Sequence, residues 1–252
     1  MRRLCLLLLP ALLLAASVVS TATAFAQTKP PNPYYSRLNT YGFFTAYSND
    51  SSHILLGIVE QRKLLEFGVS YSRRLWQGRV VNWQYNAELL PVALESDPLV
   101  TQVETLTSPF PGTFTNTYAP IGACHKDSGS YSQTVDGITY SYTYVDTCSR
   151  QWTIGEGMSP VGLQWNFRPR RKVQPFLVGH GGYMYSTRAI PIAGAGNFNF
   201  TFDFGAGLEF YRSKTRSIRA EYRYHHISNH DTASQNPGID NGLFQVTYAF
   251  GR

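Results

Sequence analysis

The chain has 252 residues, of which 14% are aromatic and only 15% are charged, against roughly 25% charged residues in soluble domains. Its mean hydropathy of −0.23 excludes a polytopic helical membrane protein. The formal charge of +6 is too small and too dispersed to indicate a nucleic-acid partner.

The N-terminus has the pattern of a secretory signal peptide. Arginines at positions 2 and 3 precede an apolar run over Leu4–Ala16, and Ala24-Phe25-Ala26 has the small-residue spacing of a cleavage site. The apolar run is shorter than the roughly 20 residues that span a bilayer as a helix. We therefore predict a signal peptide over residues 1–26 and an exported chain over 27–252.

Beyond this segment, short stretches rich in Tyr and Phe alternate with turn residues. The stretches at 41–47 and 54–61 are ambiguous, and each is compatible with a strand. Clearer strand candidates follow at 64–74, 79–90, 158–167, 173–187, 198–212, 217–228 and 242–250. Eight or nine such segments of about ten residues, separated by turns, are typical of an antiparallel transmembrane β-barrel.

The alternation within these segments supports a barrel. In 244–250, Phe, Val, Tyr and Phe at even positions alternate with Gln, Thr and Ala, and in 218–224 apolar residues alternate with Arg and Glu. Aromatic residues on one face and charges on the other suit a lipid-facing wall and a polar lumen. A periplasmic β-sandwich or a lipocalin-like barrel is the alternative fold.

The connections differ in length in a way that gives an orientation. Residues 168–172 and 213–216 form short turns, whereas 91–157 is long and rich in Ser, Thr, Gly and Pro. Bacterial barrels have short periplasmic turns and longer outer loops. We therefore expect 27–252 to be an outer-membrane barrel with one long extracellular loop or insert over 91–157.

The exported chain keeps two cysteines, Cys124 and Cys148. Two thiols in an oxidising compartment usually pair, so we predict a disulfide between them. Two free buried thiols are the alternative. Together with His125 they supply too few ligands for a metal site.

Residues 221–241 concentrate polar side chains near the C-terminus. His226 and Ser228 are two positions apart, which in a strand places them on one face within reach of each other. Asp240 precedes the neighbouring strand, so a hairpin returns it beside the histidine. This is the composition of a nucleophile, its base and an orienting acid, although a merely polar loop has the same residue types.

Two further features bear on that cluster. Asn229 and Asn236 carry amide groups able to stabilise an oxyanion. By parity, His226, Ser228 and Asp240 lie on the lipid-facing row at the outer ends of their strands, where polar groups are costly unless they sit at the interface or have a function. Such a site faces the outer leaflet, whose lipid A carries ester-linked acyl chains.

The stretch from Arg223 to Asn229, followed by Asn236-Pro-Gly-Ile-Asp240, resembles the signature of the outer-membrane lipid A 3-O-deacylases, the PagL family. Residues 174–182 and 204–210 also resemble the central strands of that family. The likeness covers about 170–252. The family's usual acid is Glu, where this chain has Asp240, and the insert at 91–157 has no counterpart in short members.

The resemblance implies an eight-stranded barrel that removes the 3-O-linked acyl chain of lipid A without a metal or other cofactor. Ser228 would be the nucleophile, His226 the base and Asp240 the acid, with Asn229 and Asn236 near the oxyanion. The partners implied are lipopolysaccharide and other outer-membrane lipids. A non-catalytic barrel with an adhesion or membrane-stability role is the alternative function, and a small pore is disfavoured because side chains fill the interior of eight strands.

Overall fold

The structure is a computed structural model that describes residues 33–252, and residues 34–252 form one compact unit. The predicted signal peptide lies outside the described residues. No helix within residues 33–252 is long and apolar enough to cross a membrane.

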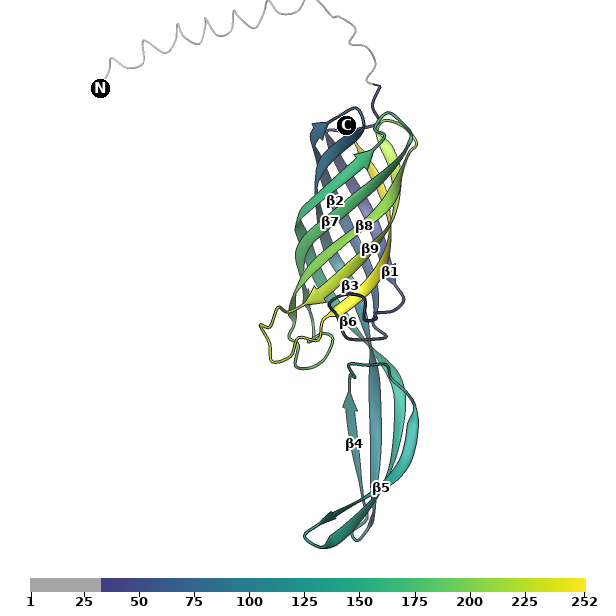
Figure 1. Cartoon of the computed structure of the whole chain (residues 1–252), viewed down its shortest axis with the longest axis vertical. Helices are drawn as coiled ribbons and strands as arrows, with labels where there is room; N and C mark the ends of the chain where they lie inside the picture. Colours follow the sequence, from purple (N-terminus) through teal and green to yellow (C-terminus); the bar gives the residue numbers. More distant parts are fainter. Residues whose placement is uncertain (1–32) are drawn as a thin grey trace, which may run out of the picture. The chain divides into compact units, whose positions relative to one another are not determined.

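Eight antiparallel strands form a closed ring (Figure 1). In ring order they are β1 (Asn39–Ser48), β2 (Lys63–Gln77), β3 (Val81–Ser108), β6 (Ile138–Phe167), β7 (Val173–Ser186), β8 (Phe198–Tyr211), β9 (Arg216–Ser228) and β10 (Ile239–Gly251). The β3–β6 and β1–β10 pairings complete the ring, so no barrel strand keeps a free edge. The predicted eight-stranded antiparallel barrel is confirmed.

The two faces of the wall divide as the alternation predicts. Phe202, Tyr222 and Phe244 are about half exposed on the outside, where a bilayer would cover them. The inside is filled by charged side chains that pair with one another. Arg223, for example, contacts Glu88 at 2.8 Å and Glu221 at 3.0 Å.

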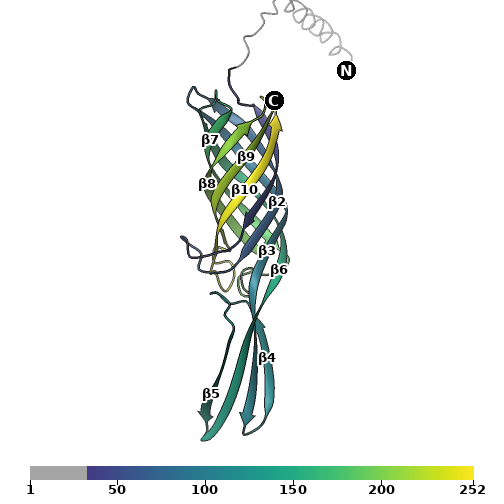
Figure 2. The same ribbon diagram turned by 90° about the vertical axis from the view of Figure 1, so that its right-hand side faces the viewer.

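Strands β3 and β6 continue together beyond the ring and form a sheet with two short strands (Figure 2). β4 (Gly112–Tyr118) pairs with β3, and β5 (Asp127–Val135) pairs with β6. The range 91–157, predicted as a long loop or insert, thus consists largely of strands. Most side chains of this extension are exposed on both faces, so the sequence lacks the apolar–polar alternation that marks a half-buried strand. Cys124 and Cys148 form a disulfide in it, with Cα atoms 6.0 Å apart.

The stretch 54–61, a possible strand by sequence, lies in the connection between β1 and β2. This connection is held by Arg62, which is fully buried and donates to Asp97 at 3.1 Å and to the carbonyls of Glu60 and Pro120 at 2.6 Å each. Burial lowers the pKa of Arg62, and the Asp97 carboxylate opposes that shift.

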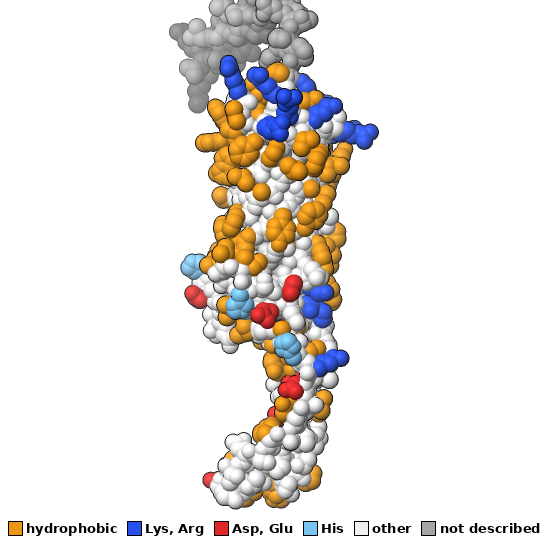
Figure 3. Space-filling model, turned by 45° about the vertical axis from the view of Figure 1, so that its right-hand side comes forward, with side chains coloured by type: hydrophobic (Ala, Val, Ile, Leu, Met, Phe, Trp, Pro, Cys, Tyr) orange, Lys and Arg blue, Asp and Glu red, His pale blue; other side chains and the backbone are white. Residues whose placement is uncertain are grey.

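The two ends of the barrel differ in loop length and in charge. The turn end carries the chain's C-terminus and the short connections β2–β3, β6–β7 and β8–β9, whereas the loop end carries the long ones. Lys and Arg side chains gather at the turn end (Figure 3). We call this group the basic rim; its members are Arg73, Arg74, Arg79, Arg168, Arg170, Arg171, Lys172, Arg212, Lys214, Arg216 and Arg252.

Candidate active site

The candidate site lies at the loop end of the β9–β10 pair. The antiparallel register places Asp240 directly opposite His226, as the hairpin argument predicts. His226 and Ser228 follow Tyr222 and Tyr224 on the outward row of β9. The site therefore opens toward the surrounding bilayer and not into the lumen.

Asp240 has more hydrogen-bond partners than any other side chain of the site. Its Oδ1 lies 2.6 Å from Nδ1 of His226 and accepts the Tyr224 hydroxyl at 2.7 Å. Its Oδ2 accepts the backbone N–H groups of Leu55 and Leu56 at 2.7 and 2.8 Å. The carboxyl group is fully buried, yet both oxygens have partners. Because Asp240 faces Nδ1, Nε2 is the ring nitrogen left for proton transfer.

The β1–β2 connection reaches Asp240 because two glycines permit the approach. A Cβ atom on Gly57 would lie 2.6 Å from the Asp240 nitrogen, and a Cβ atom on Gly238, whose φ is +63°, would lie 3.0 Å from Cε1 of His226. The Ile58 N–H also donates to the Pro237 carbonyl at 2.9 Å. The Leu55 and Leu56 amides and the Tyr224 hydroxyl were not found from the sequence, since nothing in 54–58 marks a backbone as a donor. Only Tyr224 could have been found from the sequence, because it lies two positions before His226 and therefore on the same face of the strand.

Ser228 is half-buried at the end of β9. Its Oγ lies 3.4 Å from the backbone N–H of His230, which donates to it. Within residues 33–252, no hydrogen bond joins Ser228 to His226, so the structure brings together two of the three predicted triad members by direct contact and the third by position on the same row. Such a contact often forms only when substrate is bound.

The two asparagines, Asn229 and Asn236, differ in their hydrogen-bond partners. Asn229 is buried, and its Nδ2 donates to the carbonyls of Ala195 at 2.5 Å and Gln235 at 2.7 Å. Its amide N–H groups are thus committed to holding the β7–β8 and β9–β10 loops together. Asn236 accepts the backbone N–H of Asn229 at 3.2 Å through Oδ1, and its Nδ2 makes no hydrogen bond within the described residues. Asn236 is therefore the asparagine with a free donor.

None of the remaining histidine side chains makes a hydrogen bond to Ser228, His226 or Asp240 within the described residues. His225 is buried on the lumen side, and His180 is buried beside Asp203, with 2.9 Å between Nδ1 and Oδ1. His53 and His125 are exposed in loops. His230 is exposed and packs its ring edge against Phe200. Within the described part of the chain, no group of three or more His, Cys, Asp or Glu side chains is placed to hold a metal ion.

An apolar surface surrounds the site on the outside of the barrel. Phe200 is the register partner of Ser228, and Phe202 is that of His226. Both are about 45% exposed, as is Phe204 on the same row. A site set in such a surface is accessible to molecules that are themselves embedded in the lipid.

A comparison with protein-family models identifies the family of this chain. The model described as lipid A 3-O-deacylase (PagL) matches residues 122–249, which is half of the chain and includes His226, Ser228 and Asp240. The chain belongs to the PagL family. This confirms the resemblance drawn from the 223–240 motif. It also places the protein in the bacterial outer membrane, as predicted.

Solved structures similar to this PagL-family chain are outer-membrane proteins. The crystal structure of the outer membrane enzyme PagL has 13% identity and a TM-score of 0.47, covering 84% of this chain and 99% of that one. Neisserial surface protein A (NspA) has 10% identity and a TM-score of 0.42, covering 85% and 97%. OprG from Pseudomonas aeruginosa has 11% identity and a TM-score of 0.37, covering 87% and 99%. None of the curated proteins matches the chain.

Proposed function

We propose that this protein hydrolyses the ester of the 3-O-linked acyl chain of lipid A with a Ser228–His226–Asp240 triad. The observation that carries the proposal is the His226–Asp240 pair, 2.6 Å apart on the outward face at the loop end. A lumen-facing pair of this kind would serve a water-soluble substrate, whereas this one is presented to the leaflet. Bacterial barrels direct their long loops outward, so that leaflet is the outer one.

The chemistry follows from the roles of the three side chains. Ser228 Oγ attacks the ester carbonyl while Nε2 of His226 takes its proton, and Asp240 stabilises the imidazolium that forms. The tetrahedral intermediate then collapses, and His226 returns the proton to the departing 3-hydroxyl oxygen of the sugar. Water, deprotonated by His226, attacks the acyl-enzyme and releases a free fatty acid and Ser228.

The proposal is tested by mass spectrometry of lipid A. Purified protein in detergent, incubated with lipid A, should lower the lipid A mass by one 3-O-linked acyl chain and release the matching fatty acid. Ester chains at other positions serve as the internal control and should remain. Lipid A of unchanged mass in the presence of folded protein would contradict the proposal and favour a non-catalytic barrel.

Asn236 offers a prediction about the oxyanion. Its Nδ2 is the free amide donor beside Ser228, so Asn236→Ala should lower kcat by about 10²-fold while leaving KM nearly unchanged. Gln235→Ala is the matched control, because Gln235 is exposed and its backbone makes the hydrogen bonds to Asn229 and Gly194, which the substitution keeps. Initial rates on lipid A measure both variants. Equal losses in the two would show that the loop, and not the Asn236 amide, matters.

A further inference from the structure

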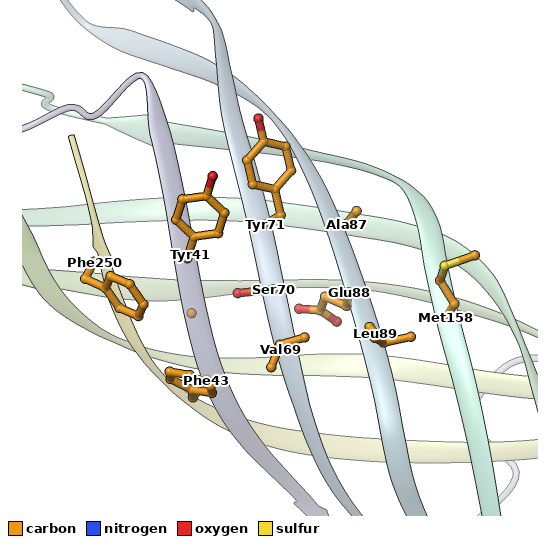
Figure 4. Close-up of a pocket in the computed structure, with 11 residues that line it drawn as sticks. Tyr41, Phe43, Val69, Ser70, Tyr71, Ala87, Glu88, Leu89, Met158 and Phe250 are labelled. Atoms are coloured by element: carbon orange, nitrogen blue, oxygen red, sulfur yellow. The ribbon is translucent and has the colours of Figure 1, made fainter.

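A hollow of about 510 Å³ lies on the outside of the barrel, away from the candidate site (Figure 4). Large side chains border it on β1, β2, β3, β6 and β10. They are Tyr41, Phe43, Tyr71, Leu89, Met158 and Phe250. The shorter Val69 and Ala87 lie between them, so the outward surface is recessed there. The exposed surface of the hollow is almost entirely apolar.

The hollow extends toward the turn end of the barrel. Phe250 is the next-to-last residue of β10, and Tyr41 is the third residue of β1. The rings of Tyr41 and Tyr71 lie 5.4 Å apart, and the Tyr71 hydroxyl donates to Asn39 at 2.9 Å. Tyrosines in this position mark the boundary between hydrocarbon and headgroups. The hollow thus lies in the half of the bilayer that faces the periplasm.

A free cation lies one outward position beyond Tyr71, the residue that borders the hollow toward the turn end. Arg73 is the next outward position after Tyr71 on β2, and it is exposed. Within the described residues it makes no hydrogen bond or ion pair. It belongs to the basic rim, and no acidic side chain of the described residues is exposed at the turn end. A zwitterionic headgroup would find no carboxylate side chain there for its ammonium group, whereas an anionic headgroup would meet the cations of the basic rim.

We propose that the hollow binds an anionic phospholipid of the inner leaflet. One acyl chain lies along the recessed apolar surface, and the phosphate contacts Arg73. This site is separate from the β9–β10 site in position and in ligand, so it does not depend on the hydrolysis proposed above. It gives the barrel a lipid preference on its periplasmic side.

Native mass spectrometry of the purified barrel tests the proposal. With equal amounts of phosphatidylglycerol and phosphatidylethanolamine, we expect phosphatidylglycerol adducts to exceed phosphatidylethanolamine adducts by about fivefold, the preference that one interfacial cation supplies. Arg73→Gln should bring the ratio near one. Arg212→Gln removes the same charge from the β8–β9 turn, across the ring, and should keep the ratio. Equal binding of both lipids to the wild type, or equal effects of the two variants, would overturn the proposal.

A second variant tests the hollow itself. Ala87→Phe places a ring in the recess from an outward, partly exposed position of β3, so the lumen packing is untouched. It should lower phosphatidylglycerol retention several-fold, and a gel-mobility shift on heating verifies that the barrel is folded. Retention equal to that of the wild type in the folded variant would show that the acyl chain lies elsewhere and would refute the site.

Discussion

Replacing Ser228 by alanine should reduce lipid A hydrolysis by at least about 10³-fold while leaving the barrel folded. In the proposed mechanism Ser228 forms the covalent bond, because the other hydroxyl on the outward row beside His226, that of Tyr224, donates to Asp240. The side chain is half-buried, and its Oγ accepts one weak hydrogen bond, from His230 at 3.4 Å. Its loss should therefore cost the fold little. Heat-modifiable gel mobility reports folding, and mass spectrometry of lipid A reports activity.

His226→Ala should have a similar effect on rate, because without the imidazole the serine hydroxyl keeps its proton. His225→Ala is not a suitable control, since His225 is buried in the lumen. His230→Ala is the better one, because the exposed His230 contacts Ser228 through its backbone and Phe200 through its ring. A folded Ser228→Ala protein with full activity would eliminate the triad and leave the barrel without an assigned nucleophile.

The alternation of aromatic and polar residues predicted the barrel strands because the physical cause is local. Each barrel strand has one face toward lipid and one toward a packed polar lumen. Successive residues of the strand therefore alternate between apolar and polar. The same logic failed for the sheet made by β4, β5 and the outer parts of β3 and β6. Both faces of that sheet are largely exposed, so no period of two is imposed on its sequence.

In the candidate site, too, the features with a local cause were predicted and those with a non-local cause were not. His226, Ser228 and Asp240 were placed correctly on one row because strand parity and hairpin length determine it. The Leu55 and Leu56 amides were not predicted, because backbone donors have no residue signature and the β1–β2 connection is far away in sequence.

The asparagines show that residue type alone does not predict which side chain has a free hydrogen-bond donor. Asn229 and Asn236 have the same side chain, and both belong to the motif that contains Ser228. The difference arises from the β7–β8 loop, whose Ala195 carbonyl accepts from Asn229. A tertiary contact of this kind decides which amide is free, and the motif alone contains no information about it.

The acid offers the sharpest test of how the site works, because its surroundings determine what each substitution does. In Asp240→Asn, the two backbone N–H groups at the Oδ2 position require an acceptor, so the amide oxygen should remain there. The NH₂ group then faces Nδ1 of His226 and the Tyr224 hydroxyl, where Oδ1 now accepts. Facing a donor, His226 should hold its proton on Nε2, which is the wrong tautomer for a base. We expect kcat to fall by about 10²–10⁴-fold, with the fold retained.

Asp240→Glu should fall between the wild type and Asp240→Asn. It keeps a carboxylate, and the resemblance to a family that usually has Glu implies that the longer side chain can serve. In this chain, however, a Cβ atom on Gly57 would lie only 2.9 Å from Oδ1 of Asp240, so the loop is fitted to the shorter acid. The added methylene must displace the loop or the imidazole, and we expect a loss of about tenfold. A pH–rate profile separates the two variants, since only the carboxylate can still stabilise the imidazolium. Equal activity of the Asn and Glu variants would show that Asp240 acts only as a structural anchor for the β1–β2 loop.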